Sequence, residues 1–340
     1  MYDIMIQNLL SPVVLFFVLG VIAALVKSDL KFPAGLSEAL SIYLLVAIGI
    51  KGGMELSHYE LHTVIKPILG TLFLGIIIPI LVLAALLFMK MDLHNSIGLA
   101  ATYGSVSIVT YGAAISFLEK KEIGYEGFMN ALVVLLESPA IIISLLLLRI
   151  LHKTDPGDLL TTPGNPQKVG LNLVSFMNLF DKEVLRDSLL GKSVLLLMGS
   201  LIIGLLVGQT AEAIVKPLFI DLYGSILILF LLNMGLIAGE RLPEISKHGW
   251  KILLFGLCVP LIGGSAGVMV GNWVGLSLGG VVLMGVLAGS SSYIAAPAAL
   301  RTSVPEANPS IYLGLSLGVT FPFNLIIGIP FYFALAQFSQ

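Results

Sequence analysis

Residues 289–297 read GSSSYIAAP, a glycine, three serines, a tyrosine and a proline set between apolar runs. Such residues weaken a helix, because Gly and Ser favour other backbone states and Pro lacks the N–H that the helix needs. A similar run, GSVSIVTYG, occupies residues 104–112. The two runs predict two interrupted helices, and the rest of the chain shows what surrounds them.

The composition indicates whether the chain folds in water or in a membrane. Of the 340 residues, 57% are hydrophobic and 11% are charged, and the mean hydropathy is +1.01, whereas soluble domains carry about 25% charged residues. The chain is therefore predicted to be an integral membrane protein. No basic patch suited to nucleic acid is present, and the single cysteine, Cys258, excludes a disulfide framework and a multi-cysteine metal site.

A membrane-spanning helix needs about 20 mostly apolar residues. Ten stretches meet this description, with one polar linker between the fifth and the sixth: 9–26, 33–50, 67–89, 95–118, 125–150, 193–215, 218–238, 250–272, 277–300 and 309–337. The chain is thus expected to comprise a first five-helix unit (1–150), a linker (151–191) and a second five-helix unit (192–340). Within the linker, residues 178–190 have the spacing of a short amphipathic helix.

Positive charges indicate the orientation, because Lys and Arg favour cytoplasmic loops. With the amino terminus outside, all but five of the 18 Lys and Arg residues lie in inside loops; the five are Lys51, Lys66, Lys120, Lys121 and Lys216. We therefore expect a multi-pass protein of the cell inner (plasma) membrane with both termini outside and the linker in the cytoplasm.

Landmarks of the first unit recur in the second at a nearly constant offset. Gly49–Gly53 aligns with Gly235–Gly239 at 186 residues, and Gly104–Ala114 aligns with Gly289–Ala299 at 185. Glu137-Ser-Pro139 aligns with Thr320-Phe-Pro322 at 183. Because each unit has an odd number of spans, the second enters the membrane from the opposite side. The predicted fold is an all-α integral membrane protein of ten transmembrane helices in two inverted five-helix repeats, broken at spans four and nine, an arrangement typical of secondary transporters.

A helix break supplies ligands for ions without any charged side chain. Free N–H groups where a helix restarts attract an anion, and carbonyls and hydroxyls where it stops suit a small cation. The predicted anion site comprises Gly104, Ser105, Val106, Ser107, Gly289, Ser290, Ser291, Ser292 and Tyr293. The predicted sodium ligands are Ser107, Thr110, Glu137, Ser290, Ser292 and Thr320. Serines at close helix contacts that only donate to carbonyls a turn away are the structural alternative.

Glu137 is a carboxyl group in the middle of a span, where such groups are costly and usually functional. It can ligate a cation or carry a proton, and a neutral structural role beside Pro139 is the alternative. Asn130, Asn233 and Asn324 are expected to form hydrogen bonds between helices. No catalytic residue set, bound metal or organic cofactor is predicted, and no phosphate-binding loop is complete, so uphill transport would use an ion gradient with sodium as the coupling ion.

Several segments resemble the cyanobacterial single-component sodium-dependent bicarbonate transporter family. They are IGIKGGMEL (48–56), YGSVSIVTYGAA (103–114), IGYEGFMNALVVLLESPA (123–140), SSSYIAAPAALRTSVPEANPSIYLG (290–314) and IPFYFALAQ (329–337). The resemblance implies a homotrimer of ten-span subunits, an elevator motion of a core against a scaffold, bicarbonate and sodium at the two breaks, and a PII-like regulator on the cytoplasmic side.

The chain also departs from that family's pattern. Tyr293 follows the serine triplet where the family has an Asp, and Ile108-Val109 replaces small residues. Glu137 stands where the family has Asp, and residues 320–323 (TFPF) are bulkier than their counterparts. These changes remove one carboxylate and narrow the site.

The leading hypothesis is a secondary active symporter, not an enzyme, that imports a small anion, bicarbonate first, with sodium. A proton-coupled or differently selective transporter is the alternative in the same class. A passive anion channel, which cannot concentrate solute, is the alternative in another class, and a membrane sensor signalling through residues 151–191 is a further one.

Overall fold

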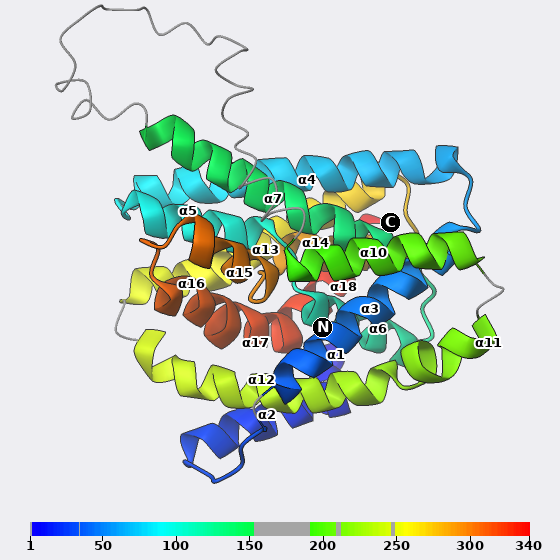
Figure 1. The fold of residues 1–340 in the computed structure, drawn as a ribbon, viewed down its shortest axis with the longest axis horizontal. Helices are drawn as coiled ribbons and strands as arrows, with labels where there is room; N and C mark the ends of the chain where they lie inside the picture. The colour runs from blue at the N-terminus through cyan, green and yellow to red at the C-terminus, as the bar shows by residue number, and fades with distance from the viewer. Residues whose placement is uncertain (1, 34, 153–190, 209–211, 246–248) are drawn as a thin grey trace, which may run out of the picture.

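The computed structural model describes residues 2–33, 35–152, 191–208, 212–245 and 249–340, and in these ranges the chain forms helices and loops with no strand (Figure 1). The expected linker helix at 178–190 lies outside the described residues. So does most of the linker itself, so its predicted boundaries stay a prediction.

Seven helical runs are long and apolar enough to cross a membrane: Leu36–Leu56, His62–Phe88, Leu93–Lys120, Met129–Leu151, Glu212–Leu242, Trp250–Trp273 and Pro309–Ser339. Three apolar helices are shorter, namely Pro12–Leu25, Lys192–Val207 and Leu278–Gly289. Each coincides with part of a predicted span. The structure therefore supports an all-helical, multi-pass membrane protein, whereas helix length alone does not establish ten crossings.

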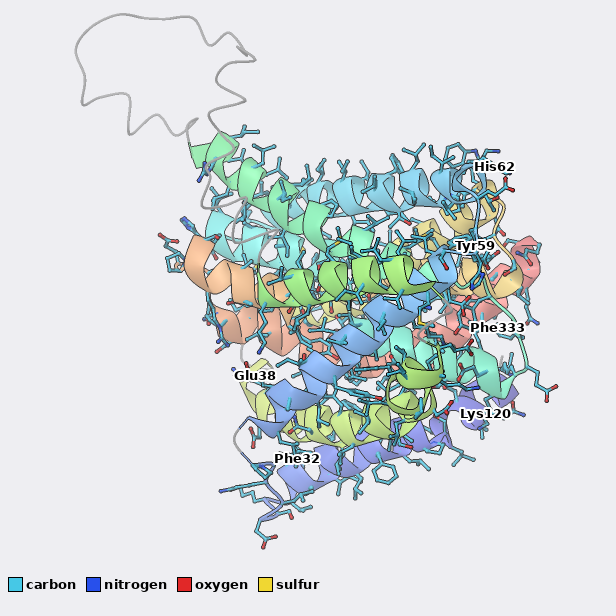
Figure 2. The ribbon with its side chains drawn as sticks, turned by 45° about the vertical axis from the view of Figure 1, so that its right-hand side comes forward. Phe32, Glu38, Tyr59, His62, Lys120 and Phe333 are labelled. Atoms are coloured by element: carbon cyan, nitrogen blue, oxygen red, sulfur yellow. The ribbon has the colours of Figure 1, made fainter. Side chains whose placement is uncertain are left out.

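Four helices, called here the frame helices, pack in two pairs. In the first pair α2 (Pro12–Leu25) lies against α12 (Tyr223–Ile245), and in the second α3 (Leu36–Leu56) lies against α10 (Lys192–Val207) (Figure 1). Glu38 near the start of α3 pairs with Lys192 at the start of α10 (Figure 2). The first pair approaches so closely that a Cβ added to Gly20 would lie 2.9 Å from the Cα of Gly235. Small residues at helix crossings allow this approach.

The remaining long helices, called the core helices, surround the interrupted segments. In the first unit, α4 (Leu61–Phe88) packs against α5 (Leu93–Gly104) and α7 (Met129–His152), and α6 (Ile108–Lys120) follows α5 along the chain. In the second, α13 (Trp250–Trp273) packs against α14 (Leu278–Gly289), which α15 (Ala295–Ser303) follows. Within an 18-residue stretch of the run Leu93–Lys120, 94% of the residues are buried, whereas 39% are buried in such a stretch of Trp250–Trp273. The interrupted span is thus enclosed by protein, where a break in the helix is tolerated.

The last span is a helix with two π-helical stretches. It comprises α16 (Pro309–Leu315), η5 (Ser316–Thr320), α17 (Phe321–Phe323), η6 (Asn324–Gly328) and α18 (Ile329–Ser339). Stretches of π-helix inside α-helices occur frequently at functional sites. They lie here beside α13 and α14.

Two predicted boundaries need correction. The span predicted at 193–215 ends at Val207, because Gly208 adopts a positive φ of 53° and stops α10; a short α11 (Glu212–Val215) and the π-helical η3 (Lys216–Asp221) then lead into α12. The span predicted from residue 9 begins at Pro12, because Ser11 caps α2 with its hydroxyl and separates it from α1 (Tyr2–Leu9).

Candidate functional site

The two predicted breaks are present and have similar geometry. Helix α5 ends at Gly104, and Ser105 follows in extended conformation (φ −89°, ψ 175°) before α6 starts at Ile108. Helix α14 ends at Gly289, and Ser290 follows with φ −90° and ψ 170° before α15 starts at Ala295. The second break is longer by two residues, so the helices restart at different points of the repeat.

The half-helices that precede the breaks have the same length and begin and end at equivalent positions of the repeat. Both α5 and α14 have 12 residues, and their bounds differ by the offset of the sequence repeat. Asp92 caps α5 by accepting the Asn95 N–H at 2.9 Å, and Ser277 caps α14 by accepting the Gly280 N–H at 3.3 Å. The local sequence therefore starts and stops both half-helices at equivalent positions.

A glycine ends each half-helix because a neighbouring helix comes too close for a side chain. A Cβ on Gly104 would lie 2.8 Å from Cδ of Pro79 in α4, and one on Gly289 would lie 2.9 Å from the Pro260 carbonyl oxygen in α13. Both glycines thus let the chain turn away from its helix while packed against another.

The two breaks contact each other directly, although they lie more than 180 residues apart. The Ser107 N–H donates to Oγ of Ser290 at 3.0 Å, and the Ser292 N–H donates to the Thr102 carbonyl oxygen at 2.8 Å. The Ser290 hydroxyl in turn donates to the Leu287 carbonyl at 3.3 Å. The structure therefore brings the two halves of the predicted anion site together.

Other hydroxyls of the breaks cap the helices that follow. Ser107 Oγ accepts the Thr110 N–H at 3.1 Å and the Thr110 hydroxyl at 2.9 Å, at the start of α6. Ser292 Oγ accepts the Ala296 N–H at 3.2 Å, at the start of α15. These bonds fix the oxygen positions. Ser107 Oγ uses both of its acceptor lone pairs and keeps its O–H as a donor, whereas Ser292 Oγ keeps one acceptor lone pair.

The breaks are buried, and some of their polar atoms have no partner. Ser105, Ser107 and Ser290–Ser292 are at most 3% exposed, and Tyr293 is 8% exposed. Eight buried side-chain atoms in the described residues make no hydrogen bond, and two of them are the hydroxyls of Ser291 and Tyr293. Buried polar groups are nearly always satisfied, so these hydroxyls suit a ligand that would accept or donate hydrogen bonds here.

Tyr293 is positioned by aromatic packing. Its ring lies edge-on to Phe321 with centroids 5.4 Å apart, and Phe321 lies edge-on to Phe17 at 5.1 Å. Its hydroxyl makes no hydrogen bond among the described residues. The residue therefore occupies the space beside the breaks and keeps a hydroxyl group there.

Glu137 lies on α7 beside the first break. Its backbone carbonyl accepts the Ser105 hydroxyl at 3.4 Å, its side chain is 1% exposed, and its Oε2 has no partner among the described residues. It is thus a third unsatisfied polar group in the neighbourhood of the breaks.

Thr320 is a predicted ligand whose two hydrogen bonds lie outside the breaks. Its hydroxyl donates to the Gly256 carbonyl at 2.8 Å and pairs with the Tyr103 hydroxyl at 2.6 Å. The second of these bonds leads to the first break, because Tyr103 precedes Gly104.

Some contributors to the site are not evident in the sequence. Thr102 contributes a backbone carbonyl, for which no sequence signal exists. Asn324 donates its side-chain amide to the Gly289 carbonyl at 2.8 Å, which confirms the expected bond between helices and places it at the second break. Asn130 also bonds between helices, accepting the Tyr111 hydroxyl at 3.1 Å, whereas the Asn233 amide nitrogen has no partner in the described residues.

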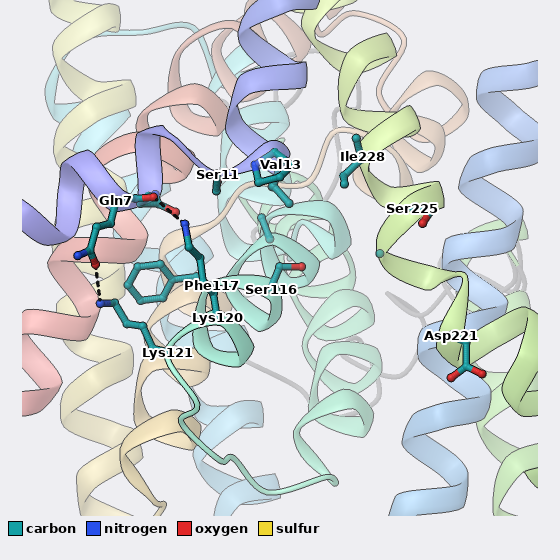
Figure 3. Close-up of a pocket in the computed structure, with 14 residues that line it drawn as sticks. Gln7, Ser11, Val13, Ser116, Phe117, Lys120, Lys121, Asp221, Ser225 and Ile228 are labelled. Carbon is teal, nitrogen blue, oxygen red and sulfur yellow. Dashed lines mark hydrogen bonds between the residues drawn. The ribbon is translucent and has the colours of Figure 1, made fainter.

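Several cavities lie where frame and core helices meet, and two of them lie between α6 and α12. One of about 210 Å³ is lined by Lys51, Glu119, Asn130 and Tyr223 among others. The other, of about 400 Å³, lies near the end of α6, where Lys120 and Lys121 donate to Gln7 (Figure 3). Residues of the breaks line neither cavity. The breaks are therefore closed off from both.

The arrangement can bind small ions in a dry environment. The break residues carry no charged side chain, so an anion would be held by N–H groups, hydroxyls and the positive ends of α6 and α15. Carbonyls at the ends of α5 and α14, the capping hydroxyls and Glu137 offer the oxygen ligands of a hard cation.

Comparison with known proteins agrees with this chemistry. No curated protein matches the chain. The model of the Na+-dependent bicarbonate transporter superfamily matches residues 12–337, from the first residue of α2 into α18, including both breaks and Glu137. The chain therefore belongs to the Na+-dependent bicarbonate transporter superfamily, and is a multi-pass membrane transport protein rather than an enzyme.

Proposed function

We propose that this protein is a secondary active symporter that imports bicarbonate together with sodium. The observation that carries the proposal is the direct contact of the two helix breaks, at which the buried Ser291 and Tyr293 hydroxyls have no partner among the residues that the structure describes. Family membership supports the choice of bicarbonate and sodium.

Bicarbonate binds between the breaks, beside Ser105–Ser107 and Ser290–Ser292, and bonds directly to the Ser291 hydroxyl, which has no partner among the described residues. It carries one negative charge and both donates and accepts hydrogen bonds, so it matches a site built from dipoles. Tyr293 donates its hydroxyl to the anion. The absence of a fixed positive charge from the breaks keeps binding weak enough for release.

Sodium binds beside the anion, on the oxygens of Ser107, Thr110, Ser290 and Ser292 with the Glu137 carboxylate. An unpaired buried carboxylate is costly, and a bound cation offsets that cost. Thr320 acts at a distance, through Tyr103, because its hydroxyl already makes two hydrogen bonds.

The two units, 1–150 and 192–340, form inverted repeats. The equal bounds and caps of α5 and α14 support this proposal. So does the packing: exchanging the units converts the α2–α12 contact into the α10–α3 contact, and the α4–α5 contact into the α13–α14 contact. A pseudo-two-fold relation of this kind places the breaks near the midplane.

Transport proceeds by an elevator motion of the core helices against the frame helices. Both breaks and Glu137 belong to the core, and the two described cavities lie at its border with the frame. In the predicted orientation these cavities open on the outer face and the linker is cytoplasmic. A homotrimer and a PII-like cytoplasmic regulator remain expectations from the family resemblance.

Proton coupling is the second candidate, and the unpartnered Oε2 of Glu137 favours it. In that case a pH gradient would drive uptake without sodium. A passive channel would equilibrate the anion without concentrating it.

The decisive experiment measures uptake of labelled bicarbonate and other small anions into proteoliposomes, with and without a sodium gradient. Wild-type protein should concentrate bicarbonate only with sodium, and Ser291→Ala should lower uptake at least tenfold, since the anion loses a hydrogen bond in a buried site. Ser265→Ala is the matched control, because that hydroxyl bonds to Leu261 within its own helix. Uptake indifferent to sodium and to Ser291→Ala would overturn the proposal.

A further inference from the structure

The kinked helix α13 presents two carbonyl groups to the last span. Pro260 lies inside α13 and has no N–H, so the Gly256 carbonyl four residues earlier loses its helical partner. The Thr320 hydroxyl donates to this carbonyl at 2.8 Å. Because its proton is used there, the Tyr103 hydroxyl is the donor in the 2.6 Å bond between Tyr103 and Thr320. This first bridge runs from α13 through Thr320 to the end of α5.

A second bridge leaves α13 one turn later. The Tyr332 hydroxyl lies 2.9 Å from the Pro260 carbonyl oxygen and 2.8 Å from Oδ1 of Asn324, and its single proton is shared between these two acceptors. Asn324 donates its amide to the carbonyl of Gly289, the last residue of α14, at 2.8 Å. This bridge runs from α13 through Tyr332 and Asn324 to the end of α14.

Both bridges are buried and tightly packed. Tyr103, Thr320, Asn324 and Tyr332 are each at most 2% exposed. A Cβ on Gly289 would lie 2.8 Å from Cζ of Tyr332. Thr320 ends one π-helical stretch and Asn324 begins the next. The last span thus meets the ends of both interrupted half-helices with side chains rather than with backbone.

We propose that the two bridges position the break residues, with Asn324 and Tyr332 holding the serine triplet and Thr320 and Tyr103 holding Ser105–Ser107. The ends of α5 and α14 lack the ladder bonds that would continue a helix, so side-chain bonds set where the following serines lie. These four are positioning residues that do not touch the ions. The claim that they tune ion binding rests on the proposed function, whereas the claim that each bridge orders its own break does not.

Hydrogen exchange tests the ordering directly. Tyr332→Phe and Tyr103→Phe each delete one oxygen atom and keep the ring, so both variants should fold. In detergent-purified protein, we expect Tyr332→Phe to raise amide exchange rates at Ser290–Ser292 and Tyr103→Phe to raise them at Ser105–Ser107, each by fivefold or more. Tyr312→Phe is the control, since Tyr312 is a buried tyrosine of the same span whose hydroxyl belongs to neither bridge.

Uptake kinetics test the consequence. We expect Tyr332→Phe and Asn324→Asp to raise the bicarbonate or sodium concentration for half-maximal uptake about tenfold, in keeping with the loss of a buried hydrogen bond, and Tyr312→Phe to leave it unchanged. If these residues were merely structural, their variants would lower the melting temperature without changing either the exchange rates at the breaks or the half-maximal concentrations. That result would refute the proposal. If wild-type protein moves no bicarbonate, the proposed function fails, while the exchange pattern still decides the positioning role.

Discussion

Tyr293 shows how one side chain can alter a site without changing its fold. Its ring takes up space beside the breaks, held by Phe321, and its hydroxyl is buried without a partner. A phenol donates a hydrogen bond and bears no charge at neutral pH. Compared with the Asp expected from the family resemblance, it therefore offers a neutral donor in place of a negative charge at this position.

Tyr293→Phe separates the two contributions of this residue. The variant removes a buried unsatisfied hydroxyl, so the protein should not lose stability and should gain up to about 1 kcal/mol. If the hydroxyl donates to the anion, the half-maximal bicarbonate concentration should rise several-fold at the same time. Thermal unfolding in detergent and uptake kinetics measure the two effects. Unchanged kinetics would mean that Tyr293 only fills space, and a lower melting temperature would mean that its hydroxyl makes a stabilising hydrogen bond within the protein.

Among the helices, glycines determine how closely the frame pairs approach. In the α2–α12 pair Gly20 faces Gly235, and in the α3–α10 pair a Cβ on Gly204 would lie 3.0 Å from the Met54 nitrogen. Neither pair can separate slightly to admit a side chain without losing contact along the helices. These glycines are therefore required by packing rather than by backbone conformation.

Gly20→Ala should consequently destabilise the protein. The added methyl group meets the backbone of α12, and overpacking of this kind costs about 1–3 kcal/mol. Gly199→Ala on α10 is the matched control, because a Cβ there meets nothing within 4 Å and alanine favours the helix by up to about 1 kcal/mol. Melting temperatures in detergent should fall for the first variant and hold or rise for the second. Equal melting temperatures would contradict the close packing of α2 on α12.

For the whole molecule, the orientation in the membrane decides which face each cavity opens on. The charge distribution predicts that the loop after α2 is cytoplasmic and the loop after α6 is external. Three helical runs separate these loops, Leu36–Leu56, His62–Phe88 and the interrupted Leu93–Lys120. The two loops lie on opposite faces only if the interrupted run also crosses.

Cysteine labelling measures this directly, because Cys258 is the single native cysteine. In a Cys258→Ser background, Glu122→Cys should react with an impermeant maleimide in intact cells, and Ser28→Cys only after permeabilisation. The opposite pattern would invert the orientation. Reaction of both residues from one side would show that one of the three intervening runs does not cross.

The sequence alone determined that the chain folds in a membrane, that it is helical, and which two runs interrupt helices. Hydropathy, Gly–Ser runs and capping residues act within a few neighbouring residues, and so the breaks were predictable to within residues 104–112 and 289–297. The early stop of α10 was missed, because the backbone conformation of Gly208 is not encoded in hydropathy.

Only the tertiary structure decided which groups meet. Three sets of contacts depend on segments from distant parts of the chain packing side by side. Ser107 donates to Ser290, the Thr320 hydroxyl bonds to Gly256 and Tyr103, and Asn324 donates to the last residue of α14. No local sequence pattern determines which partner a polar side chain bonds to, since each hydroxyl or amide can form hydrogen bonds with several groups. Burial selects among them, because every polar group that leaves water must find a partner within reach of its own rotamers.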